Sequence, residues 1–166
     1  MNRGNRPSDA DRTPQARLSE GLAHGLVGYQ LALATVVTHQ VFDERVGYSQ
    51  DLRRVEFTIL ALVRDNPDVT ARQLARALAV TPPNIATWLD RLESRKLVVR
   101  TRSAADGRVQ HIRVTTAGAA LVERAARALH EGERQALDTL SAAERAMLVE
   151  LLHKVALARR RRDAGD

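Results

Sequence analysis

Residues 70–114 read TARQLARALAVTPPNIATWLDRLESRKLVVRTRSAADGRVQHIRV, and this stretch decides the fold. Thr70 with Gln73 three residues later forms a capping box, which predicts that a short helix begins here. Thr81 followed by Pro82 predicts the start of a second helix, because threonine caps helices and proline is tolerated at the first helical position. The apolar residues of this second helix recur at steps of four and three, which predicts a buried stripe of Ile85, Leu89 and Leu92.

The face opposite that stripe is a candidate DNA-reading surface. In a helix-turn-helix, side chains near the N-terminus of the second helix meet base edges in the major groove. The candidate DNA-contacting residues of this helix are Thr81, Pro83, Asn84, Thr87 and Arg91. Asn84 suits adenine, Thr87 suits a thymine methyl group, and Arg91 suits guanine or phosphate. The alternative is an ordinary surface helix.

Two basic strands with a polar tip follow the helices. Leu97–Thr101 and Val109–Thr115 are rich in Val, Thr and Ile, which favours strands, and Asp106-Gly107 between them is a turn signal. Arg108, just past the tip, is a candidate for insertion into a narrow minor groove, with Asp106 orienting a wing arginine. An ordinary turn with a solvated charge pair is the alternative. The strands also carry candidate phosphate contacts at Arg100, Arg102 and Arg113. Two helices followed by such a hairpin predict a winged helix-turn-helix.

Charge is concentrated in the same stretch. Residues 70–115 hold nine Arg and Lys side chains against three Asp and Glu, a net +6 that equals the excess of the whole chain. A basic segment inside a folded domain, rather than on a tail, is typical of a phosphate-binding face. Double-stranded DNA is therefore the expected partner.

The residues before this stretch predict a tail and two helices. Residues 1–16 are polar and aperiodic, and we expect them to be disordered. Leu18–Val41 carries one apolar face of a long helix. Gly21, Gly25 and Gly28 in its first half favour close packing of another backbone; the alternative is that they only weaken that end of the helix. Residues 43–51 read as a loop. A further helix is expected from near Arg54 to Asn66, where Pro67 ends it.

The residues after the strands predict two more helices. Thr116 is the expected cap of a helix that runs to Leu140. Ser141 and Glu144 form a second capping box, which starts a last helix ending in the arginine run 159–162. The expected fold is mainly α with a small β-hairpin wing. Apolar faces left over at both ends of the chain imply a second copy as partner, and hence a homodimer.

Several classes of protein are excluded or disfavoured by composition. No apolar run is long enough to span a membrane, and the N-terminus is not a signal peptide, so we expect a cytoplasmic protein. Without cysteine there is no disulfide, thiolate metal site or thiol redox sensor. The histidines lack the spacing of a metal pair. Phosphate-loop, nucleophile-elbow and metalloprotease motifs are missing, so we expect no catalysis, cofactor or metal.

Taken together, several motifs resemble the MarR family of bacterial transcription regulators. The motifs are Phe57-Thr-Ile-Leu60, Thr70–Leu78, Leu89–Glu93, Leu97–Arg100, Asp106-Gly-Arg108 and Val114–Gly118. The resemblance covers about residues 18–158. It implies a single domain over residues 17–162, with a winged helix-turn-helix at about 52–116 and dimerisation helices at about 18–42 and 117–162. It also implies a homodimeric repressor, less often an activator, with wing residues Asp106 and Arg108, of which the arginine reaches the minor groove.

Members of that family often respond to small aromatic acids or phenols bound between the dimer helices and the DNA-binding lobe. The resemblance therefore implies an effector pocket, with candidate residues His39, Phe42, Tyr48 and Phe57. The chain departs from the family pattern at Arg53, Thr87 and Gly107, which stand where the family often has Ser or Thr, Arg, and Arg respectively. The missing cysteine excludes the peroxide-sensing branch.

Two functions are compatible with these patterns. The first is a ligand-responsive regulator that binds a pseudo-palindromic operator as a homodimer. The alternative is a winged-helix module that binds another protein through its outer helices without specific DNA reading. The basic segment 70–115 disfavours the alternative.

Overall fold

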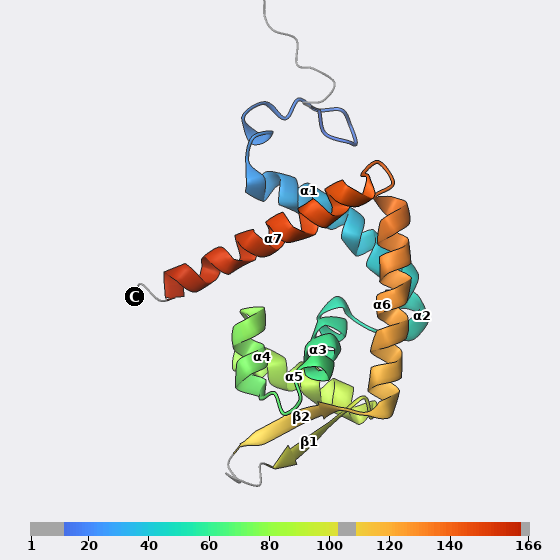
Figure 1. The fold of residues 1–166 in the computed structure, drawn as a ribbon, viewed down its shortest axis with the longest axis vertical. Coiled ribbons are helices and arrows are strands. Elements are labelled where there is room, and N and C mark those ends of the chain that lie inside the picture. Colours follow the sequence, from blue (N-terminus) through green and yellow to red (C-terminus); the bar gives the residue numbers. More distant parts are fainter. Residues whose placement is uncertain (1–11, 103–108, 164–166) are drawn as a thin grey trace, which may run out of the picture. The chain divides into compact units, whose positions relative to one another are not determined.

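The computed structural model describes residues 12–102 and 109–163, with side chains described as far as residue 158. The chain separates into two compact units, Met1–Gln40 and Val41–Asp166. The predicted fold class is confirmed, because the chain is mainly helical and carries one two-stranded antiparallel hairpin (Figure 1). None of the helices within the described part of the chain is long and apolar enough to cross a membrane.

The first unit contains a shorter helix than the sequence predicts. A single 3-10 turn, η2 (Gly21–Ala23), precedes α1 (Val27–Phe42), so the helix expected from Leu18 begins nine residues later. The physical reason lies at Gly21, whose φ of +46° belongs to a left-handed conformation that glycine adopts without strain. Within the single chain, a Cβ added at Gly21, Gly25 or Gly28 meets nothing within 4 Å, so the close packing of another backbone there stays a prediction.

Of residues 43–51, predicted as a loop, residues 43–50 are helical. A π-helical turn η3 (Asp43–Gly47) continues α1 and leads into the short α2 (Tyr48–Gln50), which stops at Asp51 with a left-handed φ of 46°. The polar composition of this segment is misleading, because its one aliphatic residue, Val46, is completely buried. Burying that single side chain holds the backbone in a helical path that a polar, aperiodic sequence does not predict.

The central helices form as their capping residues predict. α3 (Arg54–Asp65) ends before Pro67, and α4 (Ala71–Leu78) starts at the capping box, in which the Thr70 N–H donates to Gln73 Oε1 over 2.8 Å. α5 (Pro82–Ser94) has Pro82 at its first position. Thr81 occupies the predicted cap position of α5, although its side chain makes no capping hydrogen bond.

The hairpin is confirmed as β1 (Val98–Arg102) and β2 (Gln110–Val114), which pair antiparallel with Val98 opposite Val114. β2 is also tied to the α3–α4 loop, because the Ile112 N–H donates to the Val69 carbonyl over 2.9 Å. The base of the hairpin is thereby fixed to the helical core.

Two long helices end the chain, and the start of the first differs from the prediction. α6 (Thr116–Ala136) is capped by Thr115, not Thr116, since the Gly118 N–H donates to Thr115 Oγ1 over 3.0 Å. Adjacent threonines cannot be separated by pattern alone; here the Thr115 hydroxyl also donates to Lys96 O over 2.8 Å, which anchors it. α6 ends at Ala136, four residues before the predicted end. α7 (Ala142–Asp163) begins at the predicted Ser141 capping box.

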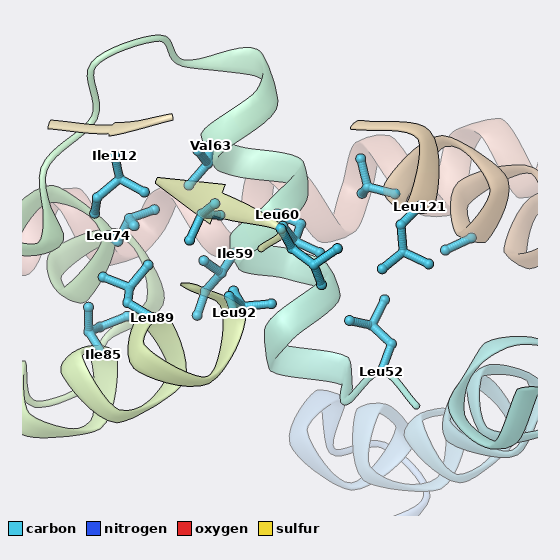
Figure 2. Packing of buried hydrophobic residues seen from close by; sticks show 14 of the residues in the cluster. Leu52, Ile59, Leu60, Val63, Leu74, Ile85, Leu89, Leu92, Ile112 and Leu121 are labelled. Atoms are coloured by element: carbon cyan, nitrogen blue, oxygen red, sulfur yellow. The ribbon is translucent and has the colours of Figure 1, made fainter. Parts of the chain in front are cut away.

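The core lies where α3, α4, α5, the hairpin and the first turns of α6 meet (Figure 2). The stripe predicted for α5 is confirmed, since its three residues are no more than 1% exposed. Burying a leucine or isoleucine contributes about 1.5–3 kcal/mol, so this stripe holds α5 firmly by one face. Trp88 packs against the edge of the same cluster.

Candidate nucleic-acid interface

The N-terminal half of α5 presents a polar face to solvent. The sequence candidates Thr81, Pro83, Asn84 and Thr87 are all exposed there. The Thr87 hydroxyl donates its single hydrogen to the Pro83 carbonyl over 3.1 Å. Thr87 can therefore offer an outside partner its methyl group and oxygen lone pairs, but not a hydrogen-bond donor. The amide of Asn84 offers both donors and an acceptor.

Arg91, the last candidate on α5, does not share this exposed face. Its side chain is 30% exposed and its Nε lies 2.9 Å from Glu56 Oε1, a carboxylate of α3 that is completely buried. A second nitrogen of Arg91 donates to Asp51 over 3.1 Å. The structure thus places Arg91 in a polar cluster that runs from the buried Glu56 to the exposed Asp51.

Arg100 on β1 is held by two carboxylates of α5. Its guanidinium lies 2.5 Å from Asp90 and 3.4 Å from Glu93, and its backbone N–H donates to Glu93. These contacts attach the first strand of the wing to α5. Arg102, further along β1, is exposed.

Arg113 on β2 is paired with Asp68 of the α3–α4 loop at 2.6 Å. The hydrogen bond from Arg113 lowers the pKa of Asp68. Asp68 also supplies its carbonyl to the His111 ring over 2.6 Å, and its left-handed φ of 65° turns that carbonyl toward β2. The loop and the second strand are therefore joined by side chains as well as by the Val69–Ile112 bridge. The wing-tip candidates, Asp106 and Arg108, lie outside the described residues.

A depression that the sequence analysis missed lies at the junction of α4 and α5. It has a volume of about 460 Å³ and is lined by Arg72, Ala75, Arg76, Ala79, Val80 and Pro82. Arg72 and Arg76 are exposed and one helical turn apart. That spacing is readable from the sequence, and the first helix of a helix-turn-helix crosses the DNA backbone, where such arginines suit phosphate.

The effector candidates of the second unit, Phe42, Tyr48 and Phe57, lie in different surroundings. Phe42 and Phe57 pack edge to face with ring centroids 6.0 Å apart and belong to the core or its border. Tyr48 is 84% exposed and lines a different depression of about 480 Å³, with Arg53, Arg54 and Leu52 among its other walls. His39 belongs to the first unit. Among the residues that the structure describes, no cluster of three or more His, Asp or Glu side chains is arranged to hold a metal ion.

Comparisons with known proteins agree with this architecture. The model of the MarR family matches residues 50–109. The solved structure of the transcriptional repressor CouR bound to a 23-mer DNA duplex is 31% identical, with a TM-score of 0.76, over 84% of this chain and 98% of that one. BpsR of Bordetella bronchiseptica, described as regulated in DNA binding by 6-hydroxynicotinic acid, is 26% identical with a TM-score of 0.70, over 80% and 94%. A MarR family protein of Mycobacterium tuberculosis in complex with salicylic acid is 27% identical with a TM-score of 0.64, over 79% and 96%.

Proposed function

The chain belongs to the MarR family of winged helix-turn-helix transcriptional regulators, and we propose that it acts as a ligand-responsive repressor that binds a pseudo-palindromic operator as a homodimer. The observation that carries this proposal is the division of α5 into a buried apolar face and an exposed face bearing Asn84 and Thr87. In a dimer the two copies of α5 would meet half-sites about 34–36 Å apart. The DNA-bound repressor among the structural relatives supports the same mode of action. No specific observation favours the alternative, a winged-helix module that binds another protein.

We assign base reading to the exposed residues of α5 and phosphate binding to cations around it. Asn84 and Thr87 would read bases, with Thr81 and Pro83 beside them. Arg102 of β1 is exposed, as are Arg72 and Arg76 of α4, and these three arginines would contact phosphates. The family resemblance assigns the minor-groove contact at the wing tip to Arg108, oriented by Asp106.

Replacing Asn84 with alanine should lower affinity for the operator about 5- to 150-fold while leaving binding to unrelated duplex DNA unchanged, because a bidentate base contact is worth about 1–3 kcal/mol of discrimination. The measurement is gel-shift titration at two salt concentrations, beginning with the DNA upstream of the protein's own gene and an unrelated competitor.

The matched contrast is Arg102→Ala. This substitution should lower the affinity for operator and competitor DNA alike and reduce the slope of log K against log salt by about 1. If Asn84→Ala weakens operator and competitor equally, Asn84 does not read a base. If no DNA, upstream or selected from a random library, outcompetes unrelated duplex, the proposal of a sequence-specific repressor fails.

We further propose that the effector is a small aromatic acid that occupies the depression beside Tyr48. The depression combines an aromatic ring, the aliphatic side chain of Val55 and the cationic side chain of Arg53. Arg54 at the same site is already paired with Asp43 at 2.7 Å. An aromatic carboxylate fits this combination, and the two relatives solved or described with 6-hydroxynicotinic and salicylic acids support that class.

Salicylate titrated into the operator complex should release the DNA, and Arg53→Ala should raise the concentration needed for half-release about 10-fold or more, because a hydrogen bond to a charged group is worth about 1.5–3 kcal/mol. Arg64→Ala is the control, since Arg64 pairs with Glu123 and does not line the depression. Equal half-release concentrations for the wild type and Arg53→Ala would place the effector elsewhere.

A further inference from the structure

The one charged side chain in the buried core of the described residues is Glu56, in the first turn of α3, which is completely inaccessible to solvent. Glu56 Oε2 accepts a hydrogen bond from the Arg53 N–H over 2.9 Å. Because an arginine side chain cannot accept, this is the half of a capping box that α3 can make. Glu56 Oε1 faces α5, where it lies 2.9 Å from Arg91 Nε.

A corner of backbone completes the surroundings of the two arginines. Arg95, one helical turn after Arg91, donates to the carbonyls of Asp51 and Gln50 over 2.5 and 3.1 Å. The Asp51 carboxylate accepts from Arg91 over 3.1 Å. Asp51 holds a left-handed φ of 46°, which is uncommon outside glycine and asparagine, at the end of α2. The C-terminal half of α5 is thus bound to α3 by an ion pair, whose geometry is not that of a hydrogen bond, and to the Gln50–Asp51 corner by hydrogen bonds.

Stability alone does not explain this arrangement. Burying a carboxylate carries a large desolvation penalty, and a buried ion pair is often no more stabilising than apolar side chains of similar volume. What such a pair can supply is a defined geometry. The buried stripe of α5 decides which face of the helix is turned inward, but its attraction is non-directional, so the stripe alone does not fix the exact rotation of the helix about its axis. The hydrogen bonds of Arg91 and Arg95 to the Gln50–Asp51 corner do fix it.

We propose that Glu56 and the Gln50–Asp51 corner form a polar clamp that sets the orientation of α5, the helix that carries the proposed base-reading residues. Arg91 and Arg95 then act on DNA through the clamp, as positioning residues, and contact neither a base nor a phosphate. Asn84 lies about 10 Å along the helix axis from Arg91, so a rotation of the helix at the clamp moves the reading residues with it. This inference rests on the proposed DNA-binding function and names a determinant of its specificity.

The test uses the paired substitution Glu56→Gln with Arg91→Gln. Glutamine at position 56 keeps an acceptor for the Arg53 N–H, and the pair leaves the net charge unchanged and no buried carboxylate without a partner. The clamp predicts that the ratio of operator to unrelated-DNA affinity falls about tenfold, as for coupled residues of one network. It also predicts that the slope of log K against log salt stays at the wild-type value.

Two results would overturn the clamp. A salt slope reduced by about 1, with equal losses on both DNAs, would make Arg91 a phosphate contact. An unchanged affinity ratio would show that the cluster does not position the reading face. Failure of the wild-type protein to prefer any DNA would instead contradict the proposed function, and it would leave the ratio without meaning.

A measurement without DNA covers that case. Hydrogen exchange of the backbone amides at residues 91–95 should be faster in the paired variant than in the wild type, and equal exchange rates would overturn the clamp. If the paired variant does not fold, Asp51→Asn serves in its place, because asparagine tolerates the left-handed conformation and retains the carbonyl that Arg95 uses. It should show the same loss of specificity to a smaller extent, and an unchanged affinity ratio would again contradict the clamp.

Discussion

Aspartate in place of both Leu148 and Leu152 on α7 is expected to leave the protein folded but monomeric, with operator affinity lowered about 100-fold or more. Both leucines are 39% exposed in the single chain, and they share a face with Val155 at 52%. An apolar face of this kind calls for a partner, and the proposed partner is a second copy. Carboxylates placed in such an interface would be desolvated without compensation.

Sedimentation equilibrium checks the first part, because the mass should fall from twice 18.3 kDa to 18.3 kDa. Gel-shift titration checks the second, since a monomer binds one half-site without the gain of linking two. Glu150→Ala is the control on the opposite face of α7, where Glu150 forms an exposed pair with Lys154 that should contribute little. A double-aspartate variant that stays dimeric would remove α7 from the dimer interface.

The elements predicted well from sequence are those whose signals are local. The capping boxes at Thr70 and Ser141 and the apolar stripe of α5 involve residues three or four apart. Such residues are neighbours on one helix whatever the rest of the chain does. The strands followed in the same way from runs of β-branched residues beside a turn signal. Periodicity and capping therefore located α4, α5 and the hairpin.

What the sequence could not show is which charges meet across the fold. Arg91 pairs with Asp51, forty residues away in the sequence, and Arg113 pairs with Asp68, forty-five residues away. Neither separation follows the period of a helix or a strand, so the sequence does not predict these pairs. From the sequence alone, the basic segment therefore predicts a surface that faces DNA. The local departures have similar causes: Val46 is buried by distant contacts, and Thr115 is chosen over Thr116 by its bond to Lys96.

These pairings change how the charge of the wing region should be understood. Four arginines of this region contact carboxylates or carbonyls of the protein itself, namely Arg91, Arg95, Arg100 and Arg113. Their guanidinium groups are therefore largely engaged in contacts that hold the protein's own elements together. Under the proposed function, the field that attracts DNA would then depend on cations at the edge of the module, such as Arg72 and Arg102. Base reading would depend on uncharged side chains of α5. The salt dependence of operator binding should accordingly be smaller than nine basic residues would suggest.

Alanine in place of Gly118 is expected to destabilise the protein by on the order of 3 kcal/mol, at the upper end of what overpacking usually costs. A Cβ at this position would lie 2.1 Å from the Leu97 carbonyl oxygen and 2.8 Å from Val114 Cγ2. The carbonyl cannot easily move away, because it accepts the hydrogen bond of the Thr115 N–H over 3.0 Å. The start of α6 and the base of the wing would have to separate, which disturbs the Thr115 cap as well.

Two other glycines make the comparison quantitative. A Cβ at Gly132 would lie 2.7 Å from Val41 Cγ1 and 2.9 Å from Arg45 Cγ, which are side-chain atoms that can shift, so Gly132→Ala should cost less. A Cβ at Gly25 meets nothing within 4 Å, so Gly25→Ala should change stability by no more than about 0.5 kcal/mol. In thermal unfolding at one fixed protein concentration, Gly118→Ala should then lower Tm by about 10 °C, and Gly132→Ala should lower it less. Equal Tm values for the three variants would contradict the close contact of α6 with the wing, because only a contact with immobile backbone makes position 118 the most sensitive of the three.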